Sequence, residues 1–576
     1  MQQPITREEK AQRILQMHER TRSEFNVHQN AMRVIADYCR PSNDTVDSGD
    51  GKPQPAQALK RHTRLFDTTA SRAVIKHAAG VKSWMSSSQK RWFLADPPVA
   101  YKHDEEVIKF YMACTEVMEQ LMKDSVSSFH TEDQEAMQDG CAFGIRCLFV
   151  DEPQKDGSLL VQQWEPGSFA CEENNKGRLD KFVRVKEMTA QQAKSEFGEA
   201  NLPEKVRADL MKEASKGNKH TFIHAIYPRE DDERNADHDY LAQNKAIASC
   251  WVHLDSKTLV RESGFDEMPV IGSRYLKKPG SPYGIGAALV SLADARQLNY
   301  LQERIDVMIG LLVNPTMNVP SEFDASDVNL GEGGINYYND PQRMITPMQR
   351  QVSNGQQEMA RVQMRREDIR DAFFLNIFEA VSRKTKEMSA LEADLVSKEA
   401  IELFSPMFTL MTGEHYQPAL SRIFLMYLRQ SEIARAVGDV SRAVFPPIPK
   451  KLLREIKPGL AEFPTPQFSY TSRIALALQQ LHSQAFNNSL MRRTQLGNII
   501  GEAAFDDINL PVALKEMDRS DGLPENWFRS PQEVQQMQQN RAQQAQLQAM
   551  AAAAKDGSAA VKNIKGTPLE GALQPQ

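Results

Sequence analysis

Apolar positions between residues 281 and 391 predict two long helices. Over 285–312 they recur at steps of three, four, three and four, which places them on one face of an amphipathic helix. The residues of this stripe are Leu298, Leu301, Ile305, Met308 and Leu312. Helical spacing returns over 352–387, at Val362, Ile369, Phe373 and Ile377. Apolar stripes of this kind must be covered by another element, because exposed apolar area is unfavourable in water.

The insert between the two helices, 313–351, is rich in residues that interrupt helices. They are Pro315, Pro320, Gly331, Gly333, Gly334 and Pro341. Ile335, Tyr337 and Tyr338 suit short β-strands, since aromatic and β-branched residues favour them. The block therefore predicts two helices that carry a β-containing tip. Such an arrangement suits assembly and has no catalytic pattern.

The first 280 residues alternate between helical and strand patterns. Helical spacing predicts helices over 7–39 and 104–138, and a third helix that Asp67 or a neighbouring Thr can cap. The polar, turn-rich segment 42–57 predicts a mobile loop. Five apolar segments predict strands: LFVDEP, LLVQQWEP, FVRVKEM, TFIHAIYP and SCWVHLD. The chain as a whole is therefore expected to be an α+β, helix-rich protein.

The C-terminal third is again predominantly helical in pattern. After Met388 the helical spacing is broken at Pro406, Gly413 and Pro418, and further helices are expected over 471–530. From 531 the chain is rich in Gln and Ala, which are good helix formers. We expect helix there to about Lys555 and a disordered end.

Length and composition indicate a chain of several modules. With 576 residues it exceeds one hydrophobic core, since domains are typically about 50–200 residues long. Hydrophobic residues make up 41% and the mean hydropathy is -0.52. No run of about 18 uncharged apolar residues is present, and the N-terminal segment carries charges where a signal peptide needs an apolar core. We expect an intracellular origin and no membrane partner.

Motifs that carry chemistry are missing from the sequence. The six cysteines, at 39, 114, 141, 147, 171 and 250, lack the paired spacing of a zinc site and are expected to be reduced, structural thiols. The segment GDGKP lacks the length and the hydroxyl of a phosphate-binding loop, and no HExxH occurs. We therefore expect no enzyme activity, no metal and no cofactor.

Two blocks of the chain resemble the portal, or head-to-tail connector, proteins of short-tailed (T7-like) bacteriophages. That family has a Tyr-Gly-x-Gly entry to a long helix, then an Asp, a Leu-Asn pair and a Gly-rich segment that ends in Asn-Tyr-Tyr. It also has a Phe/Tyr-Asp-Ser/Thr-Thr-Ala helix start followed by Trp-Phe. The matching residues are Tyr283, Gly284, Gly286, Asp294, Leu298, Asn299, Asn314, Pro315, Gly333, Gly334, Asn336, Tyr337 and Tyr338 for the first block, and Phe66, Asp67, Thr68, Thr69, Ala70, Trp92 and Phe93 for the second. With further echoes, the resemblance spans roughly residues 10–540.

The resemblance implies a subunit of a ring, with twelve copies in the family. The ring would occupy one capsid vertex of the virion after assembly in the bacterial cytoplasm. Double-stranded DNA would enter and leave through its centre. Its partners would be copies of itself, the large subunit of the terminase, a tail adaptor, and capsid and scaffolding proteins. The parts would be a wing over 1–284, a stem helix over 285–312, a clip over 313–351, a second stem helix over 352–387, a tunnel segment and the rest of the wing over 388–470, a helical crown over 471–530 and the C-terminal extension over 531–576.

Three groups of residues are candidates for contacts in such a ring. Arg383, Lys384 and Lys386 precede the tunnel segment and could approach DNA, although they also suit an ordinary solvated helix end. Tyr337 and Tyr338 lie in the expected clip and could meet a partner protein. The third group, on the second stem helix, could form ion pairs between helices or between subunits. It consists of Glu358, Arg361, Arg365, Arg366, Asp368 and Arg370.

The net charge agrees with a conduit for DNA. Lys and Arg total 70 and Asp and Glu total 76, so the chain carries 70 minus 76, or -6. Twelve copies would carry 12 times -6, or -72, and would repel the DNA phosphates instead of retaining them. Two alternatives from other classes stay open: a non-conducting tail or scaffolding component, and, against the missing phosphate loop, an ATP-driven packaging enzyme.

Overall fold

The computed structural model describes the chain in stretches. They are residues 6–313 apart from 89, 103, 125, 155, 231–232 and 234–240, then 317–318, 346–347, 355–382, 405–457, 460–462, 465–470 and 491, and scattered positions between 534 and 546. The chain divides into two units, Met1–Ala477 and Leu478–Gln576. The described positions of the Gln/Ala-rich segment are all helical, as the composition predicts.

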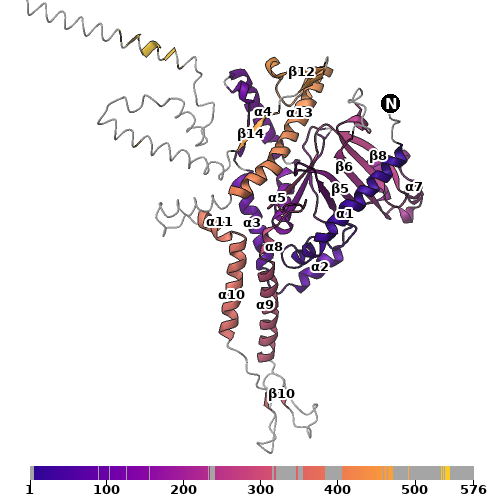
Figure 1. Ribbon diagram of the computed structural model, residues 1–576, viewed down its shortest axis with the longest axis vertical. Coiled ribbons are helices and arrows are strands. Elements are labelled where there is room, and N and C mark those ends of the chain that lie inside the picture. Colours follow the sequence, from indigo (N-terminus) through magenta and orange to yellow (C-terminus); the bar gives the residue numbers. More distant parts are fainter. Residues whose placement is uncertain are drawn as a thin grey trace, which may run out of the picture. The chain divides into compact units, whose positions relative to one another are not determined.

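A five-stranded antiparallel sheet forms much of the N-terminal α+β region (Figure 1). Its two faces are covered by different helices because side chains alternate along each strand. Ile14 of α1 (Arg7–Tyr38) belongs to the apolar cluster on one face, with Ile223 and Val252. Phe197 of α6 (Ala190–Phe197) and the following α7 (Glu204–Met211) cover the other face. In spatial order the strands are β4 (Phe169–Glu173), β5 (Leu179–Thr189), β6 (Lys219–Pro228), β7 (Ile247–His253) and β8 (Thr258–Phe265).

A second, three-stranded sheet has the order β3 (Val161–Gln163), β2 (Ile145–Val150), β9 (Val270–Arg274). β2 is buried along its whole length, which confirms the buried strand predicted there. Gly144, with φ 82°, joins it to α5 (Phe129–Phe143). A Cβ atom on Gly284 would lie 2.5 Å from the Gly144 carbonyl oxygen, and one on Gly286 would lie 2.5 Å from that of Cys141. The Tyr-Gly-x-Gly motif therefore needs glycine because two backbones touch there.

Further helices and two strand pairs belong to the same unit. α2 was not predicted, and the helix predicted over 104–138 is in fact two helices. Between them the Asp124 carboxylate accepts a hydrogen bond from the backbone N–H of Val126 at 3.2 Å, which favours a turn. These elements are α2 (Pro55–Arg64), α3 (Thr69–Met85), α4 (Glu105–Lys123), α13 (Gln417–Val437), and the strand pairs β1 (Phe93–Asp96) with β14 (Gln467–Tyr470) and β12 (Arg454–Lys457) with β13 (Leu460–Glu462).

The prediction of a mobile loop over 42–57 is wrong. Val46 and Asn43 are buried, and long side chains from flanking helices bind the loop's backbone. The Arg61 guanidinium donates to the Asn43 carbonyl at 2.6 Å, and the Gln29 amide donates to the Val46 carbonyl at 3.1 Å. The Thr45 hydroxyl donates to the Pro166 carbonyl at 2.7 Å. The loop is fixed because charged and amide side chains that look solvated in sequence supply its missing hydrogen bonds.

Two carboxyl groups beside this loop have raised pKa values. Burial raises the pKa of Asp139 to about 6, against the opposing charge of Arg40, whose Nε donates to it at 3.1 Å. Burial, reinforced by repulsion from Asp139 and Asp44, raises the pKa of Glu165 to about 7. The Thr45 hydroxyl lies 3.5 Å from Glu165. The packed loop therefore adjoins a carboxyl that prefers to be protonated near neutral pH.

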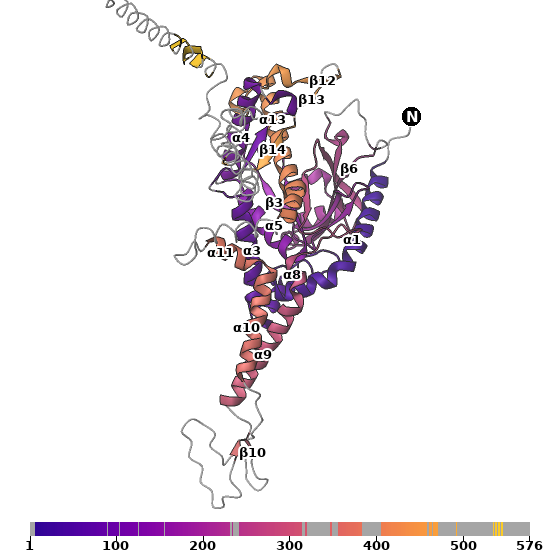
Figure 2. The same cartoon turned by 60° about the vertical axis from the view of Figure 1, so that its left-hand side comes forward.

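The predicted helical pair is present. α8 (Ala287–Val290) and α9 (Leu292–Val313) replace the first long helix, and α9 lies beside α10 (Gly355–Ala372) in both views (Figures 1 and 2). β10 (Met317–Asn318) pairs with β11 (Thr346–Pro347) in the insert between them. Ile335, Tyr337 and Tyr338, for which strands were predicted, lie outside the described residues.

The second long helix is not continuous, contrary to the sequence prediction. α10 ends at Ala372 and α11 (Leu375–Ser382) follows after a turn in which Phe374 has a φ of 54°. The backbone turns because residues of α3 form a hydrogen bond to this segment and pack against it. The His77 Nδ1–H donates to the Phe373 carbonyl at 2.8 Å, and burial lowers the pKa of His77 to about 4, which keeps it neutral. The Phe378 ring packs directly on Gly80, with the Trp84 ring 4.8 Å away.

Replacing Gly80 with Ala should destabilise the protein. A Cβ atom at this position would meet the Phe378 ring at 2.8 Å, a clash of the size that costs about 1–3 kcal/mol when a well-packed site is overfilled. A lowered thermal midpoint and faster amide exchange in α11 are expected. Gly310→Ala is the matched control, because Gly310 is also helical and has no atom within 4 Å of the added carbon. That variant should gain up to about 1 kcal/mol, and equal effects of the two changes would contradict the packing argument.

Replacing Glu165 with Gln should remove a pH-dependent loss of stability. Because the pKa of Glu165 is raised in the folded chain to about 7, the folded state binds its proton more tightly than the unfolded state. The wild-type chain therefore loses stability as pH rises from the ordinary glutamate pKa through about 7. The variant should be more stable than wild type at pH 8, by on the order of 2 kcal/mol, and close to it at pH 4.5. Denaturation at both pH values tests this, with the exposed Glu204→Gln as control; a pH-independent difference would contradict it.

Candidate functional site

A narrow apolar seam and an ion pair between Arg365 and Asp294 join the helices α9 and α10. Leu298 and Ile305 of α9 are buried, as the spacing predicts, and Val362 and Ile369 of α10 are buried as well. Leu301 and Met308 are half-buried. At the edge of the seam Arg365 donates to the Asp294 carboxylate at 2.9 Å, which links the two helices directly. An apolar seam allows helices to rotate, whereas this pair fixes which faces point outward.

The next residue of α10, Arg366, ties the pair to the start of α3. Its guanidinium lies 2.8 Å from the Asp67 carboxylate, whose side chain is 5% exposed. Asp67 also accepts the backbone N–H of Thr69, the first residue of α3, at 2.7 Å, so it satisfies one free N–H of the helix from the position before the N-cap residue, Thr68. Burial works to raise the pKa of Asp67, but the hydrogen bonds from Thr69 and Arg366 prevail and lower it. This carboxylate therefore stays ionised at neutral pH.

The two sequence blocks that carry the family resemblance meet at this junction. The Asn299 side-chain oxygen accepts the backbone N–H of Phe66 at 2.8 Å and that of Asp67 at 3.3 Å. Asp294 and Asp67 bind the adjacent Arg365 and Arg366. Asn299, Asp294 and Asp67 thus position α3, α9 and α10 relative to one another.

α9 and α10 each present an exposed stripe on the side away from the seam. On α9 it carries Arg296, Tyr300, Arg304 and Val307, and Tyr300 and Val307 are 53% and 52% exposed. The Arg304 guanidinium lies 5.1 Å from the centre of the Tyr300 ring. On α10 the stripe carries Ala360, Met364, Glu367 and Asp371, at steps of four, three and four. The α9 stripe carries two arginines and an aromatic ring beside the exposed Glu303, and the α10 stripe is acidic with small or flexible apolar residues.

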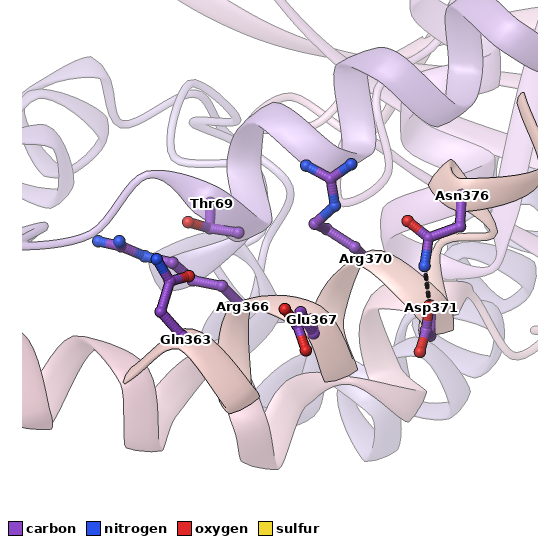
Figure 3. Close-up of a pocket in the computed structure, with 7 residues that line it drawn as sticks. All are labelled: Thr69, Gln363, Arg366, Glu367, Arg370, Asp371 and Asn376. Carbon is purple, nitrogen blue, oxygen red and sulfur yellow. Dashed lines mark hydrogen bonds between the residues drawn. The ribbon is translucent and has the colours of Figure 1, made fainter. Parts of the chain in front are cut away.

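A cavity of about 460 Å³ lies over the acidic end of the α10 stripe. Figure 3 shows Arg366, Glu367, Arg370 and Asp371 reaching it from α10, with Thr69 on the α3 side. Gln363 and Asn376 complete its lining. Arg370 is held by Glu379 at 2.8 Å, and Asp371 accepts a hydrogen bond from the neutral amide of Asn376.

The structure accounts for the candidate ion-pairing residues of the second stem helix within one chain. Arg365 contacts Asp294 and Asp368, Arg366 contacts Asp67, and Arg370 contacts Glu379. Arg361 is exposed and Glu358 is half-buried. Whether any of them also pairs across subunits stays a prediction. The other candidates, Tyr337, Tyr338, Arg383, Lys384 and Lys386, lie outside the described residues.

Sequence analysis missed a buried polar chain that resembles a hydrolytic triad. The Ser273 hydroxyl lies 3.2 Å from Nδ1 of His415, and Nε2 of His415 lies 2.9 Å from the Asp133 carboxylate. All three residues are fully buried, and Ser273 accepts a hydrogen bond from Nε of Arg146 at 2.6 Å. Because no substrate can reach the hydroxyl, this arrangement joins segments and cannot act as a nucleophile.

The same hydrogen-bonded side chains connect the segment Thr412–Tyr416 to the core of the protein. His415 lies in a π-helical turn, Thr412–Tyr416, directly before α13. The carboxylate of the neighbouring Glu414 accepts a hydrogen bond from Nε of Arg274 in β9, and the Tyr416 hydroxyl donates to Ser86 at 2.8 Å. The pKa of Asp133 is lowered. Burial alone would raise it, but the positive charge of Lys82 and the hydrogen bond from His415 outweigh the effect of burial. No signal in the sequence predicts this turn, since its partners are 140–330 residues away.

Cysteines, metals and membrane helices can be assessed for the described stretches. All six cysteines are unpaired and buried, and burial raises the pKa of Cys39 and of Cys250 to about 12. Among the described residues no cluster of three or more His, Cys, Asp or Glu is arranged to hold a metal. Within those stretches, no helix combines the length and the apolar character needed to cross a bilayer.

Comparisons with known proteins find a matching family and individual relatives of this chain. A model of the bacteriophage head to tail connecting protein family matches residues 11–528. The portal protein of Salmonella phage epsilon15 is 23% identical over 577 aligned positions, which cover 97% of this chain and 95% of that protein. The probable portal protein of Bordetella phage BPP-1 is 26% identical over 374 positions, covering 63% of this chain and 66% of that protein. A chain from the virion of a native gene transfer agent particle is 12% identical with a TM-score of 0.32, and the alignment covers 82% of this chain and 94% of that one.

The family match spans both motif blocks, the helical pair that they position and both sheets, and it covers far more than half of the sequence. The chain therefore belongs to the family of bacteriophage head to tail connecting proteins.

Proposed function

We propose that this chain is the subunit of a ring at one capsid vertex of a phage, through which double-stranded DNA is packaged and later ejected. The observation that carries the proposal is the family match over residues 11–528, which includes the entire α9–α10 pair. The relatives named portal protein support the same reading. That the phage is short-tailed and T7-like remains part of the proposal.

The geometry of the helical pair supports assembly into a closed ring. A ring of identical subunits uses head-to-tail contacts, so each subunit needs two different and complementary surfaces. The exposed stripes of α9 and α10 differ in that way. One carries Arg296 and Tyr300 and the other carries Met364, Glu367 and Asp371. In the proposal twelve copies form the ring.

Charge supports passage of DNA without tight attachment. The chain's net charge is -6, and a ring of twelve would carry 12 times -6, or -72. A duplex with about one charge per 1.7 Å would be repelled by such a wall and could slide. In the proposal Arg383, Lys384 and Lys386 give the channel a local cationic contact, and Tyr337 and Tyr338 dock a partner at the clip.

The proposed partners follow from this position in the particle. During filling the ring would dock the large subunit of the terminase, which would supply the energy of translocation from ATP. It would then join a tail adaptor, with capsid and scaffolding proteins around it. The chain itself would act through its shape, since the one triad-like arrangement found among its described residues, at Ser273, is closed to substrate.

Purified full-length protein should assemble into rings with an open bore. Negative-stain images and sedimentation velocity should show a closed particle of about twelve subunits, because each copy exposes two unlike surfaces. The same preparation should release no phosphate from ATP. A non-conducting component would give filaments or plugged particles, and a packaging enzyme would hydrolyse ATP. A solitary compact particle under assembly conditions would overturn the proposal.

The cationic segment after α11 should affect DNA retention and leave the ring intact. Particles that carry Arg383→Ala, Lys384→Ala and Lys386→Ala together should contain rings in normal number but retain less packaged DNA, as measured by DNA content per particle. The physical reason is the loss of three charges that attract phosphates in the channel. Three exposed lysines of the sheet region, changed as Lys205→Ala, Lys212→Ala and Lys219→Ala, form the control. Equal DNA content in both sets would contradict the role.

A further inference from the structure

Charges around the cavity of Figure 3 are unevenly satisfied within the chain. The two arginines that line it are engaged, Arg366 by Asp67 and Arg370 by Glu379. Glu367 is exposed, and Asp371 accepts a hydrogen bond from a neutral amide, that of Asn376. The cavity therefore presents two carboxylates beside cations that are already neutralised. A cationic side chain is the group that such a cavity fits best.

We propose that this cavity is a socket for Arg296 from a second copy of this chain, so that the α9 stripe of one subunit docks on the α10 stripe of the next. In this arrangement Arg296 pairs with Glu367, which lines the cavity. Tyr300 then covers Ala360 and Met364 one turn further along. The inference rests on the proposed ring and names the surface by which its subunits recognise each other.

The register of the two stripes agrees with this contact. The ion pair between Arg365 and Asp294 places these residues at one level of the antiparallel pair. At ~1.5 Å per residue, Arg296 lies about 3 Å from that level toward the insert, and Glu367 lies about 3 Å from it in the opposite direction. The two positions on neighbouring copies at the same height would be separated by about 6 Å along the axis. Long Arg and Glu side chains span such an offset.

Apolar residues next to the charges favour a protein partner of the same stripe pattern. Tyr300 is 53% exposed and Met364 is 56% exposed, and they are adjacent to Arg296 and Glu367 on their helices. Aromatic and Met side chains beside an Arg are enriched at protein interfaces. A free metal ion fits less well, because no described cluster of three acidic or His ligands is arranged to hold one. A second copy supplies both the cation and the aromatic ring at the required spacing.

A charge exchange across the interface tests the proposal. Arg296→Glu alone and Glu367→Arg alone should each place like charges in contact, weaken each subunit–subunit contact about tenfold, which corresponds to about 1.4 kcal/mol per interface, and lower the fraction of chains in rings. The double variant should recover ring formation to within about threefold, since the ion pair is rebuilt in reverse. Sedimentation velocity and negative-stain images give the ring fraction. Arg207→Glu and Glu204→Arg, on the exposed side of α7, form the matched control pair.

A crosslink gives a second readout that does not depend on assembly energy. Arg296→Cys combined with Glu367→Cys should yield a ladder of covalent multimers with a flexible bis-maleimide crosslinker, because the two positions are too far apart for a direct disulfide, whereas either single variant should yield none beyond background. All six native cysteines are buried and should not contribute.

The outcomes separate this inference from the proposed function. Rings that form normally in both single charge variants, with no ladder in the double cysteine variant, would overturn the socket and leave the ring standing. Disruption by the single variants without recovery in the double variant would also overturn the direct contact. A wild-type chain that forms no ring would overturn the proposed function and the socket together. Thermal unfolding of each variant must match wild type, so that a loss of rings reports the interface.

Discussion

Two adjacent arginines of α10 fix how this helix packs against α9 and the start of α3. Arg365 and Arg366 follow one another in sequence, so their side chains leave the helix about 100° apart. One reaches Asp294 of α9 and the other reaches Asp67 before α3. A single helix is thereby held against two elements from distant parts of the chain. Its rotation is determined, and with it the faces that remain exposed.

Directional charge is needed because the helical pair can bury little apolar surface. In α10 only Val362 and Ile369 are fully buried among the side chains that the structure describes. A partly exposed ion pair contributes at most about 1 kcal/mol to stability. Its value here is geometric, since it excludes rotations and sliding that an apolar seam would allow. The burial of Asp67, at 5% exposure, makes the Arg366 contact the more demanding of the two.

Local spacing predicted the elements but not the contacts that bend or immobilise them. The stripe at Leu298 and Ile305 is periodic, and the structure buries both residues. The break at Phe374 could not be predicted, because its cause is the packing of Phe378 on Gly80, almost 300 residues earlier. The loop over 42–57 was predicted to be solvated because its hydrogen-bond partners are also remote from it or outside it. They are Arg61 and other helical side chains, which the sequence pattern places on the surface.

Buried polar groups throughout the described chain join segments that are remote in sequence. The Ser273–His415–Asp133 chain joins β9, the π-helical turn and α5, and it has the spacing of a nucleophilic site without any access. Removing one member would leave a charge or hydroxyl buried and unpaired, which costs more than the lost bond itself. The network therefore enforces one arrangement of β9, the π-helical turn and α5. In the proposed ring a subunit acts through the faces it presents to copies of itself. That role requires a single arrangement, because an error in one orientation would recur at every interface.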